Sequence, residues 1–220
     1  GKHKKSGVFL DMRDLFIIGA RFPDCVRTFF ESQEMSKYKL LGVLDDNIEL
    51  KGGMVLGVPI LGPIALLNNH ANSWVFNSVA LSKEPREKVN EKLKKYGVQF
   101  ASIIHESVNI DYCDIGLGCY IARTSYIEPK VKIGFGSMIL PGATIGHDTE
   151  IGRNCFISSG VHVGGNVGIG DYTWIGAGSC LHPGSSIAAG SVIDMNSNVT
   201  VKSKRQIFIT NPRSKIHTKG

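Results

Sequence analysis

Hydrophobic residues recur every six positions through the second half of the chain. Stepping by six from Ile115 to Val199 meets fifteen positions, and each holds isoleucine, valine or leucine. Four residues after each aliphatic position lies a small or β-branched side chain, and glycine often follows the aliphatic residue directly. Helices repeat near 3.6 residues and strands near two, so neither explains a period of six. The pattern predicts a triangular parallel β-helix, with roughly 18 residues per coil and about five coils.

The first part of the chain follows another pattern, in which short apolar runs alternate with helical segments. Strands are expected at residues 14–20, 39–47 and 73–81, helices at 23–33 and 83–97, and a short strand and helix within 58–70. This alternation is typical of a parallel α/β sheet. We therefore predict a tail at 1–13, a small Rossmann-like α/β domain at 14–105, and a β-helix domain with a C-terminal extension at 106–220. The β-helix resembles the left-handed hexapeptide type, an exception to the right-handed crossover rule.

Composition and charge narrow the choice of partners. The 220 residues are 42% hydrophobic, and no apolar run approaches the roughly 20 residues of a membrane span or resembles a signal peptide. A net charge of +6 fits a polyanionic ligand such as a nucleotide or coenzyme A. Nucleic acid is not expected, because aromatic and basic residues are not interleaved. The five cysteines form no metal-ligand spacing, so we expect small buried side chains in the reducing cytoplasm.

One histidine on the repeat is a candidate for catalysis. His147 follows the aliphatic Ile145 by two positions, where the chain turns outward, and Asp148 comes next. Positions 18 apart stack, so His147 is expected beside Gly165 in "VGGNVG", where missing side chains expose backbone amides. A base beside bare amides suits acyl transfer, because amides stabilise a developing oxyanion. From these residues alone, a solvated corner histidine is an equal alternative.

Longer motifs carry a family resemblance over nearly the whole chain. "IGHDTEIG", "GVHVGGNVGIGDYTWIGAGSCLHPGSSI" and the closing "NPRSKI" resemble the sugar acetyltransferases of sialic-acid, perosamine and bacillosamine synthesis. The resemblance implies an N-terminal nucleotide-sugar-binding domain, a left-handed β-helix and a homotrimer. It also implies an acetyl-CoA-dependent N-acetyltransferase that acts on a nucleotide-linked amino sugar in bacterial surface-glycan biosynthesis, without a metal.

The resemblance also implies roles for particular residues. His147 would be the general base with Asp148 as its partner, and Gly165 would place its N–H on the thioester carbonyl. Further residues would bind the two substrates. For acetyl-CoA they are Ala177, Gly178, Met195, Asn211, Pro212 and Arg213, and for the nucleotide sugar Gly19, Ala20, Arg21, Asp45 and Asp46.

The sequence departs from the family in its first turn. The family usually carries a glycine-rich GAGGHG after the first strand, whereas this chain reads "GARFPDC", with Arg21 and Phe22 where small residues are expected. Arg21 would either pair with a phosphate or block the pocket. This keeps open an O-acetyl or other acyl transferase with a different acceptor.

A non-catalytic or metal-dependent hexapeptide protein is the remaining alternative. His162 and His182 suggest a metal site with His147 as a third ligand. The hexapeptide carbonic anhydrases hold zinc through histidines that include an H-x4-H pair, and that pair is absent here. The three histidines also fall at different positions of the repeat, so we expect no metal.

Overall fold

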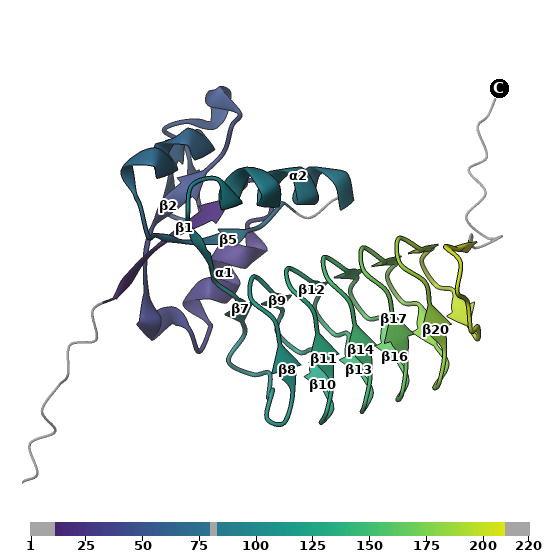
Figure 1. Cartoon of the computed structure of the whole chain (residues 1–220). Coiled ribbons are helices and arrows are strands. Elements are labelled where there is room, and N and C mark those ends of the chain that lie inside the picture. The colour runs from purple at the N-terminus through teal and green to yellow at the C-terminus, as the bar shows by residue number, and fades with distance from the viewer. Residues whose placement is uncertain (1–11, 80–82, 210–220) are drawn as a thin grey trace, which may run out of the picture.

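The N-terminal part of the computed structural model is one mostly parallel sheet (Figure 1). The structure describes residues 12–79 and 83–209. The strand order is β3-β4-β2-β1-β5-β6, and β3 alone is antiparallel, to β4. The strands are β1 (Arg13–Ile18), β2 (Tyr38–Leu44), β3 (Met54–Val55), β4 (Val58–Gly62), β5 (Trp74–Asn77) and β6 (Gln99–Phe100). The central β1 pairs in parallel with β2 and β5, and both β1 and β2 end on buried aliphatic residues, which confirms the predicted parallel α/β sheet.

Helices cover this sheet and connect its strands. The helices are α1 (Asp24–Phe30), α2 (Lys83–Lys94) and three short 3-10 turns, η1 (Met35–Lys37), η2 (Ile48–Leu50) and η3 (Ile64–Asn69). Helix α1 is shorter than the predicted 23–33, because Glu31 leaves helical geometry and the chain turns at Ser32. One apolar cluster packs α1 against one side of the sheet and also includes Tyr120 and Met138 of the β-helix.

Three parallel sheets form the sides of a β-helix, consistent with the predicted left-handed hexapeptide type. Sheet 1 contains β8 (Asp114–Ile115), β11 (Lys132–Ile133), β14 (Glu150–Ile151), β17 (Gly168–Ile169) and β20 (Ser186–Ile187). Sheet 2 contains β7 (Ile103–Ile104), β9 (Tyr120–Ile121), β12 (Met138–Ile139), β15 (Phe156–Ile157), β18 (Trp174–Ile175), β21 (Val192–Ile193) and β23 (Phe208–Ile209). Sheet 3 contains β10 (Tyr126–Ile127), β13 (Thr144–Ile145), β16 (His162–Val163), β19 (Cys180–Leu181) and β22 (Asn198–Val199).

The repeat predicted from the sequence is the repeat of the coils. Paired residues on neighbouring coils are 18 positions apart, as in Ile145 with Val163, so the predicted register is confirmed. The β-helix extends beyond the regular repeat from Ile115 to Val199, because β7 pairs with β9 before it and β23 pairs with β21 after it. The chain passes from sheet 1 to 2 to 3 and back to 1, and we name its turns corners 1–2, 2–3 and 3–1.

Aliphatic and small residues both point into the β-helix. The aliphatic positions from Ile121 to Val199 are buried in one core cluster. The small residues four positions later are buried too, and several of them link successive coils. Ser137 is an example, since its Oγ donates to the Gly152 carbonyl at 2.7 Å and accepts from the Cys155 N–H at 2.9 Å. Such bonds satisfy buried backbone groups that the turns leave unpaired.

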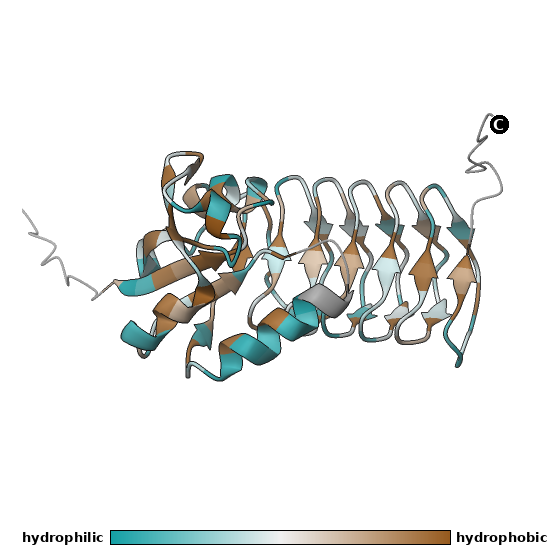
Figure 2. Ribbon diagram, turned by 90° about the horizontal axis from the view of Figure 1, so that it is seen from above, coloured by the Kyte–Doolittle hydropathy of each residue, from teal (hydrophilic) through white to brown (hydrophobic). Residues whose placement is uncertain are grey.

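The α/β part packs on sheet 2. Tyr120 on β9 is fully buried, and its hydroxyl lies 2.9 Å from Asp24 Oδ2 and 2.8 Å from Thr28 Oγ1 of α1. Helix α2 runs alongside corner 1–2 of the β-helix, where Asn90 Nδ2 donates a hydrogen bond to Asn154 Oδ1 at 3.1 Å. Figure 2 shows hydrophobic strands stacked along the β-helix, with the largely hydrophilic α2 running beside them.

All five cysteines are free thiols, and three of them act as core residues. Cys25, Cys119 and Cys155 are buried, and burial raises their pKa values to about 12, 11 and 12. These thiols stay protonated at neutral pH. Their predicted role as small hydrophobic side chains is confirmed.

Candidate functional site

His147 lies on corner 3–1, between β13 and β14. Two features of the sequence form this turn. Gly146 has no side chain, and a Cβ there would lie 2.5 Å from the Gly165 nitrogen of the next coil. Asp148 takes a left-handed conformation with φ of 56°, which short polar residues adopt more easily than others. The turn therefore projects the His147 side chain outward, and 57% of it is exposed.

The contacts of His147 set its protonation pattern. Its Nδ1 lies 2.9 Å from Asp148 Oδ2. An ionised carboxylate only accepts hydrogen bonds, so Nδ1 carries the proton and Nε2 keeps a free lone pair. The hydrogen bond from His147, together with the charge of Lys130 at 3.8 Å, holds the pKa of Asp148 below its usual value. The predicted pairing of His147 with Asp148 is present in this geometry.

Two further residues support this corner and were not predicted from the sequence. Glu128 Oε2 accepts a hydrogen bond from the backbone N–H of His147 at 2.7 Å, and Lys130 pairs with Asp148. Both lie on corner 3–1 one coil earlier. The 18-residue stacking could have predicted the position of Lys130, because Lys130 precedes Asp148 by 18 positions. Glu128 precedes His147 by 19 positions, so it lies close to the same register.

Gly165 lies directly against the imidazole, as the stacking predicted. A Cβ on Gly165 would lie 2.6 Å from His147 Nε2 and 2.9 Å from Cε1. The neighbouring Asn166 N–H donates to the His147 carbonyl at 2.8 Å and so fixes one coil on the other. The Gly165 N–H itself makes no hydrogen bond within the described residues. A basic nitrogen and an unused amide donor therefore share one corner.

This close contact makes Gly165→Ala a sharp test of the corner. The added methyl group would push the imidazole away from its position, so we expect kcat for acyl transfer to fall by about 10²-fold. Gly168→Ala is the matched control, because its Cβ would meet only Ser186 Oγ, at an ordinary 3.8 Å. Circular dichroism and thermal melting check that both variants fold. Equal activity in the two variants would contradict the site.

The residues expected to bind coenzyme A lie at a different corner. Ala177, Gly178 and Met195 belong to corner 2–3, where the Asn196 N–H donates to the Ala177 carbonyl at 2.8 Å. Ala177, Gly178 and Met195 are exposed. Between this corner and His147 lies the outer face of sheet 3, where Thr144 Oγ1 and His162 Nδ1 are 2.8 Å apart. The predicted Asn211, Pro212 and Arg213 lie outside the described residues.

The predicted nucleotide-sugar residues gather at the carboxyl ends of β1 and β2. The Gly19 N–H donates to the Leu44 carbonyl at 2.8 Å, and the Ala20 N–H donates to Asp45 Oδ2 at 2.9 Å. Gly19 has φ of 97°, and a Cβ there would meet Val79 Cγ2 at 3.0 Å. Arg21 is exposed beside this turn. Strands β2 to β4 lie on one side of β1, and the later strands β5 and β6 lie on the other, so the strand order reverses at β1. Ligands of open α/β sheets bind at such a switch point. We call the carboxyl ends of β1 and β5 and the turn after β1, residues 18–22 and 77–79, the crevice.

Asp45 and Asp46 both make contacts within the chain. Asp45 Oδ1 accepts from the Asn47 N–H at 2.9 Å, in addition to the bond from Ala20. Asp46 Oδ1 accepts from the Ile64 N–H at 3.0 Å, and its Oδ2 pairs with Lys92 Nζ at 2.6 Å. Desolvation works against ionisation of Asp46, but the bonds from Lys92 and Ile64 outweigh it and hold its pKa below the usual value. Each carboxylate oxygen has a second lone pair, so a ligand hydroxyl can still be accepted.

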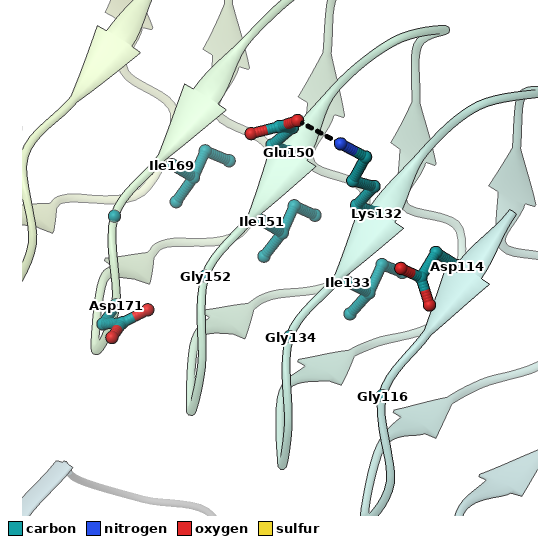
Figure 3. Close-up of a pocket in the computed structure, with 11 residues that line it drawn as sticks. Asp114, Gly116, Lys132, Ile133, Gly134, Glu150, Ile151, Gly152, Ile169 and Asp171 are labelled. Atoms are coloured by element: carbon teal, nitrogen blue, oxygen red, sulfur yellow. Dashed lines mark hydrogen bonds and ion pairs between the residues drawn. The ribbon is translucent and has the colours of Figure 1, made fainter.

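A shallow groove of about 380 Å³ crosses sheet 1 (Figure 3). Charged side chains line it, and Lys132 pairs with Glu150 at 2.7 Å. None of the predicted site residues is among its described lining residues. This groove is therefore separate from corner 3–1, where His147 and Gly165 lie.

The described residues contain neither a group of side chains that could hold a metal ion nor a helix that could cross a membrane. Within residues 12–79 and 83–209, no three His, Cys, Asp or Glu side chains are grouped to hold a metal ion. Over the same residues, every helix is too short or too polar to cross a membrane.

Comparison with known proteins relates the β-helix to transferases. Residues 130–165 match the family model described as bacterial transferase hexapeptide (six repeats). A stretch of 57 residues is 35% identical to the bifunctional protein GlmU of Syntrophotalea carbinolica. This stretch is 26% of the chain and spans only 12% of that relative's length.

Solved structures extend the likeness to nearly the whole chain. A perosamine N-acetyltransferase from Caulobacter crescentus, solved with CoA and GDP-perosamine, has a TM-score of 0.79 at 20% identity and covers 89% of this chain and 90% of its own. The acetyltransferase domain of PglB from Neisseria gonorrhoeae has a TM-score of 0.78 at 22% identity over 86% and 92% of the two chains. WeeI from Acinetobacter baumannii has a TM-score of 0.76 at 23% identity over 90% and 97%. At these identities the likeness is one of fold, and in fold the resemblance to sugar acetyltransferases is confirmed.

Proposed function

We propose that the protein is an acetyl-CoA-dependent N-acetyltransferase whose acceptor is a nucleotide-linked amino sugar. The observation that carries the proposal is that His147 Nε2 lies beside Gly165, whose N–H makes no hydrogen bond within the described residues. This pair provides the two groups that acyl transfer requires, a base for the attacking amine and a donor for the oxyanion. Two of the structures with this fold belong to acetyltransferases, and one was solved with CoA and GDP-perosamine.

The proposed reaction follows from these two groups. The sugar amine attacks the thioester carbonyl, a C–N bond forms, and His147 Nε2 takes the proton that the nitrogen releases. The Gly165 N–H donates to the carbonyl oxygen while that oxygen carries negative charge. The C–S bond then breaks, and the protonated His147 returns its proton to the coenzyme A thiolate. Asp148 accepts from Nδ1 throughout and stabilises the imidazolium.

We assign coenzyme A to the outer face of sheet 3. This face joins corner 3–1, with Gly165, to corner 2–3, with Ala177, Gly178 and Met195. Pantetheine laid across it would bring its thioester to His147. Asn211, Pro212 and Arg213 remain predicted contacts for the nucleotide end of the coenzyme.

We assign the nucleotide sugar to the α/β part and treat residues 14–105 as a Rossmann-like domain beside a catalytic β-helix domain at 106–220. The carboxyl ends of β1 and β2 present Gly19, Ala20, Arg21, Asp45 and Asp46 at the switch point of the sheet. Arg21 is exposed and free to meet a phosphate by charge.

We propose a homotrimer, because the two sites of one chain lie apart and neighbouring subunits could bring them together. The crevice lies next to sheet 2, since the Phe22 and Tyr120 rings are 5.4 Å apart. His147 lies on corner 3–1, the corner opposite sheet 2, so one face of the β-helix separates it from its own crevice. We therefore propose that each active site pairs His147 of one subunit with the crevice of its neighbour. We place the reaction in the cytoplasm, where thiols such as these five stay reduced, and in surface-glycan biosynthesis.

One observation favours a second candidate, acyl transfer to a hydroxyl or to another acceptor. The Ala20 N–H, which a phosphate would need in a glycine-rich turn, is already bonded to the Asp45 carboxylate. A ligand phosphate would have to displace this carboxylate or use Arg21 instead. An acceptor without a diphosphate avoids this competition.

A thiol-release assay separates the two candidates. Acetyl-CoA is incubated with UDP-, GDP- and dTDP-linked amino sugars and with the matching hydroxy sugars, and free coenzyme A is measured. We expect one nucleotide class of amino sugar to be turned over and no hydroxy sugar. Turnover of hydroxy sugars alone would support the second candidate. Binding of acetyl-CoA without turnover of any substrate would refute the first.

A further inference from the structure

Arg86 is an arginine buried between the two parts of the molecule. It lies on α2, and only 4% of its surface is exposed. Its Nη1 donates to the carbonyls of Asn77 at 2.8 Å and Val79 at 3.0 Å, at the end of β5. Its Nε donates to the Gly136 carbonyl at 3.0 Å, on corner 1–2 of the β-helix. One guanidinium therefore joins the wall of the crevice to the β-helix.

The hydrogen-bond acceptors around Arg86 are neutral. Within the described residues they are three backbone carbonyls and the Met138 sulfur, and no carboxylate is among them. Burial lowers the pKa of Arg86 to about 10, so the side chain is still charged at neutral pH. A buried charge without an opposite charge is unfavourable, and a neutral amide could bridge the same carbonyls. The guanidinium of Arg86 would therefore be stabilised by a negatively charged group bound nearby.

The crevice is where such a partner would lie. Val79 accepts from Arg86 through its carbonyl, while its nitrogen and Cγ2 lie against Gly19. Ser78, between Asn77 and Val79, donates to the Ile18 and Gly19 carbonyls at 2.8 Å each. Val79 therefore lies between the buried guanidinium of Arg86 and the turn at Gly19 that follows β1. The charge of Arg86 acts through a medium of low dielectric constant, whereas that of the exposed Arg21 is screened by water.

We propose that Arg86 is a positioning residue whose buried positive charge selects a diphosphate, and hence a nucleoside diphosphate sugar, for the crevice. The inference rests on the proposed function, because it assumes that the crevice binds a nucleotide. Arg86 does not touch the ligand. It acts through the end of β5, which it holds in place, and through the electrostatic potential that it creates at the crevice.

Isothermal titration calorimetry on the full chain tests this proposal. UDP, GDP, dTDP and the corresponding monophosphates are titrated into the wild type, Arg86→Gln and Asn154→Gly. We expect Arg86→Gln to weaken diphosphate binding by about 10- to 30-fold, the order of magnitude for removing one nearby unit charge at an effective dielectric constant near 20. The loss for the monophosphates should be smaller, and acetyl-CoA binding should be unchanged. Asn154→Gly breaks the link to α2 but keeps the charge, and glycine tolerates the φ of 52° at this position.

Each outcome supports or overturns the proposal. Equal losses for mono- and diphosphates, or equal losses in Arg86→Gln and Asn154→Gly, would show that Arg86 is only a structural link. If Arg86→Gln does not fold, Arg86→Lys is used, which keeps a cation and should bind the diphosphate within about threefold of the wild type. A tenfold loss in the lysine variant would then overturn the proposal. A wild-type protein that binds none of these nucleotides would refute the nucleotide part of the proposed function itself.

Discussion

Replacing His147 by alanine is expected to lower the rate of thiol release by about 10²–10⁴-fold, the usual contribution of a general base. The side chain projects from a corner whose backbone is held by Glu128, Pro129 and the next coil, so its loss leaves the turn intact. Acetyl-CoA binding should therefore persist, and the loss should fall on kcat. Steady-state kinetics on the accepted sugar and calorimetry with acetyl-CoA measure the two effects separately.

Lys132→Ala is the matched control for this experiment. Lys132 is also an exposed side chain of the β-helix, paired with Glu150 at 2.7 Å, but it lies on sheet 1, away from the proposed coenzyme site on sheet 3. It should retain most of the activity. A His147→Ala variant as active as Lys132→Ala would exclude His147 as the base.

The pH profile gives a second test of the same residue. The wild-type kcat/KM should rise with pH, because a general base accepts the proton of the amine only in its unprotonated form. Asp148 should not add a step to the profile near neutral pH. Its pKa lies below the usual value because it accepts a hydrogen bond from His147, so it is already ionised. An activity that rises toward acid pH would argue against a basic His147.

The fold was largely predictable because its repeat is short and strict. A period of six over fifteen aliphatic positions fixes the coil length, the register and the direction of every such side chain. The same register predicts from the sequence alone that His147 lies beside Gly165. The ends of the β-helix were less visible, since β7 and β23 carry the pairing past the regular repeat.

Contacts between distant segments could not be predicted in this way. Tyr120 and Asp24 are 96 positions apart, and Arg86 and Gly136 are 50 apart. No local pattern relates such pairs, because they depend on how α1 and α2 dock onto the β-helix. No pattern in the sequence marks Arg86 as buried, so its position required the structure.

Mixing two inactive variants is expected to restore activity, because the proposed site is shared between subunits. One partner is His147→Ala, and the other is a crevice variant shown beforehand not to bind nucleotide, such as Arg21→Glu. After subunit exchange at equal amounts, each site draws its base from one subunit and its crevice from another. About a quarter of the sites should then be intact, so the rate should recover to about a quarter of the wild-type rate.

The geometry also supplies the control for this experiment. His147 and Gly165 lie on the same corner of the same chain, so a mixture of His147→Ala with Gly165→Ala contains no intact corner and should stay inactive. Differently tagged subunits verify that exchange has occurred. If exchanged trimers of His147→Ala and Arg21→Glu remained inactive, the crevice would have to serve the His147 of its own chain. That would require the α/β part to leave sheet 2, where Tyr120 and Arg86 now hold it.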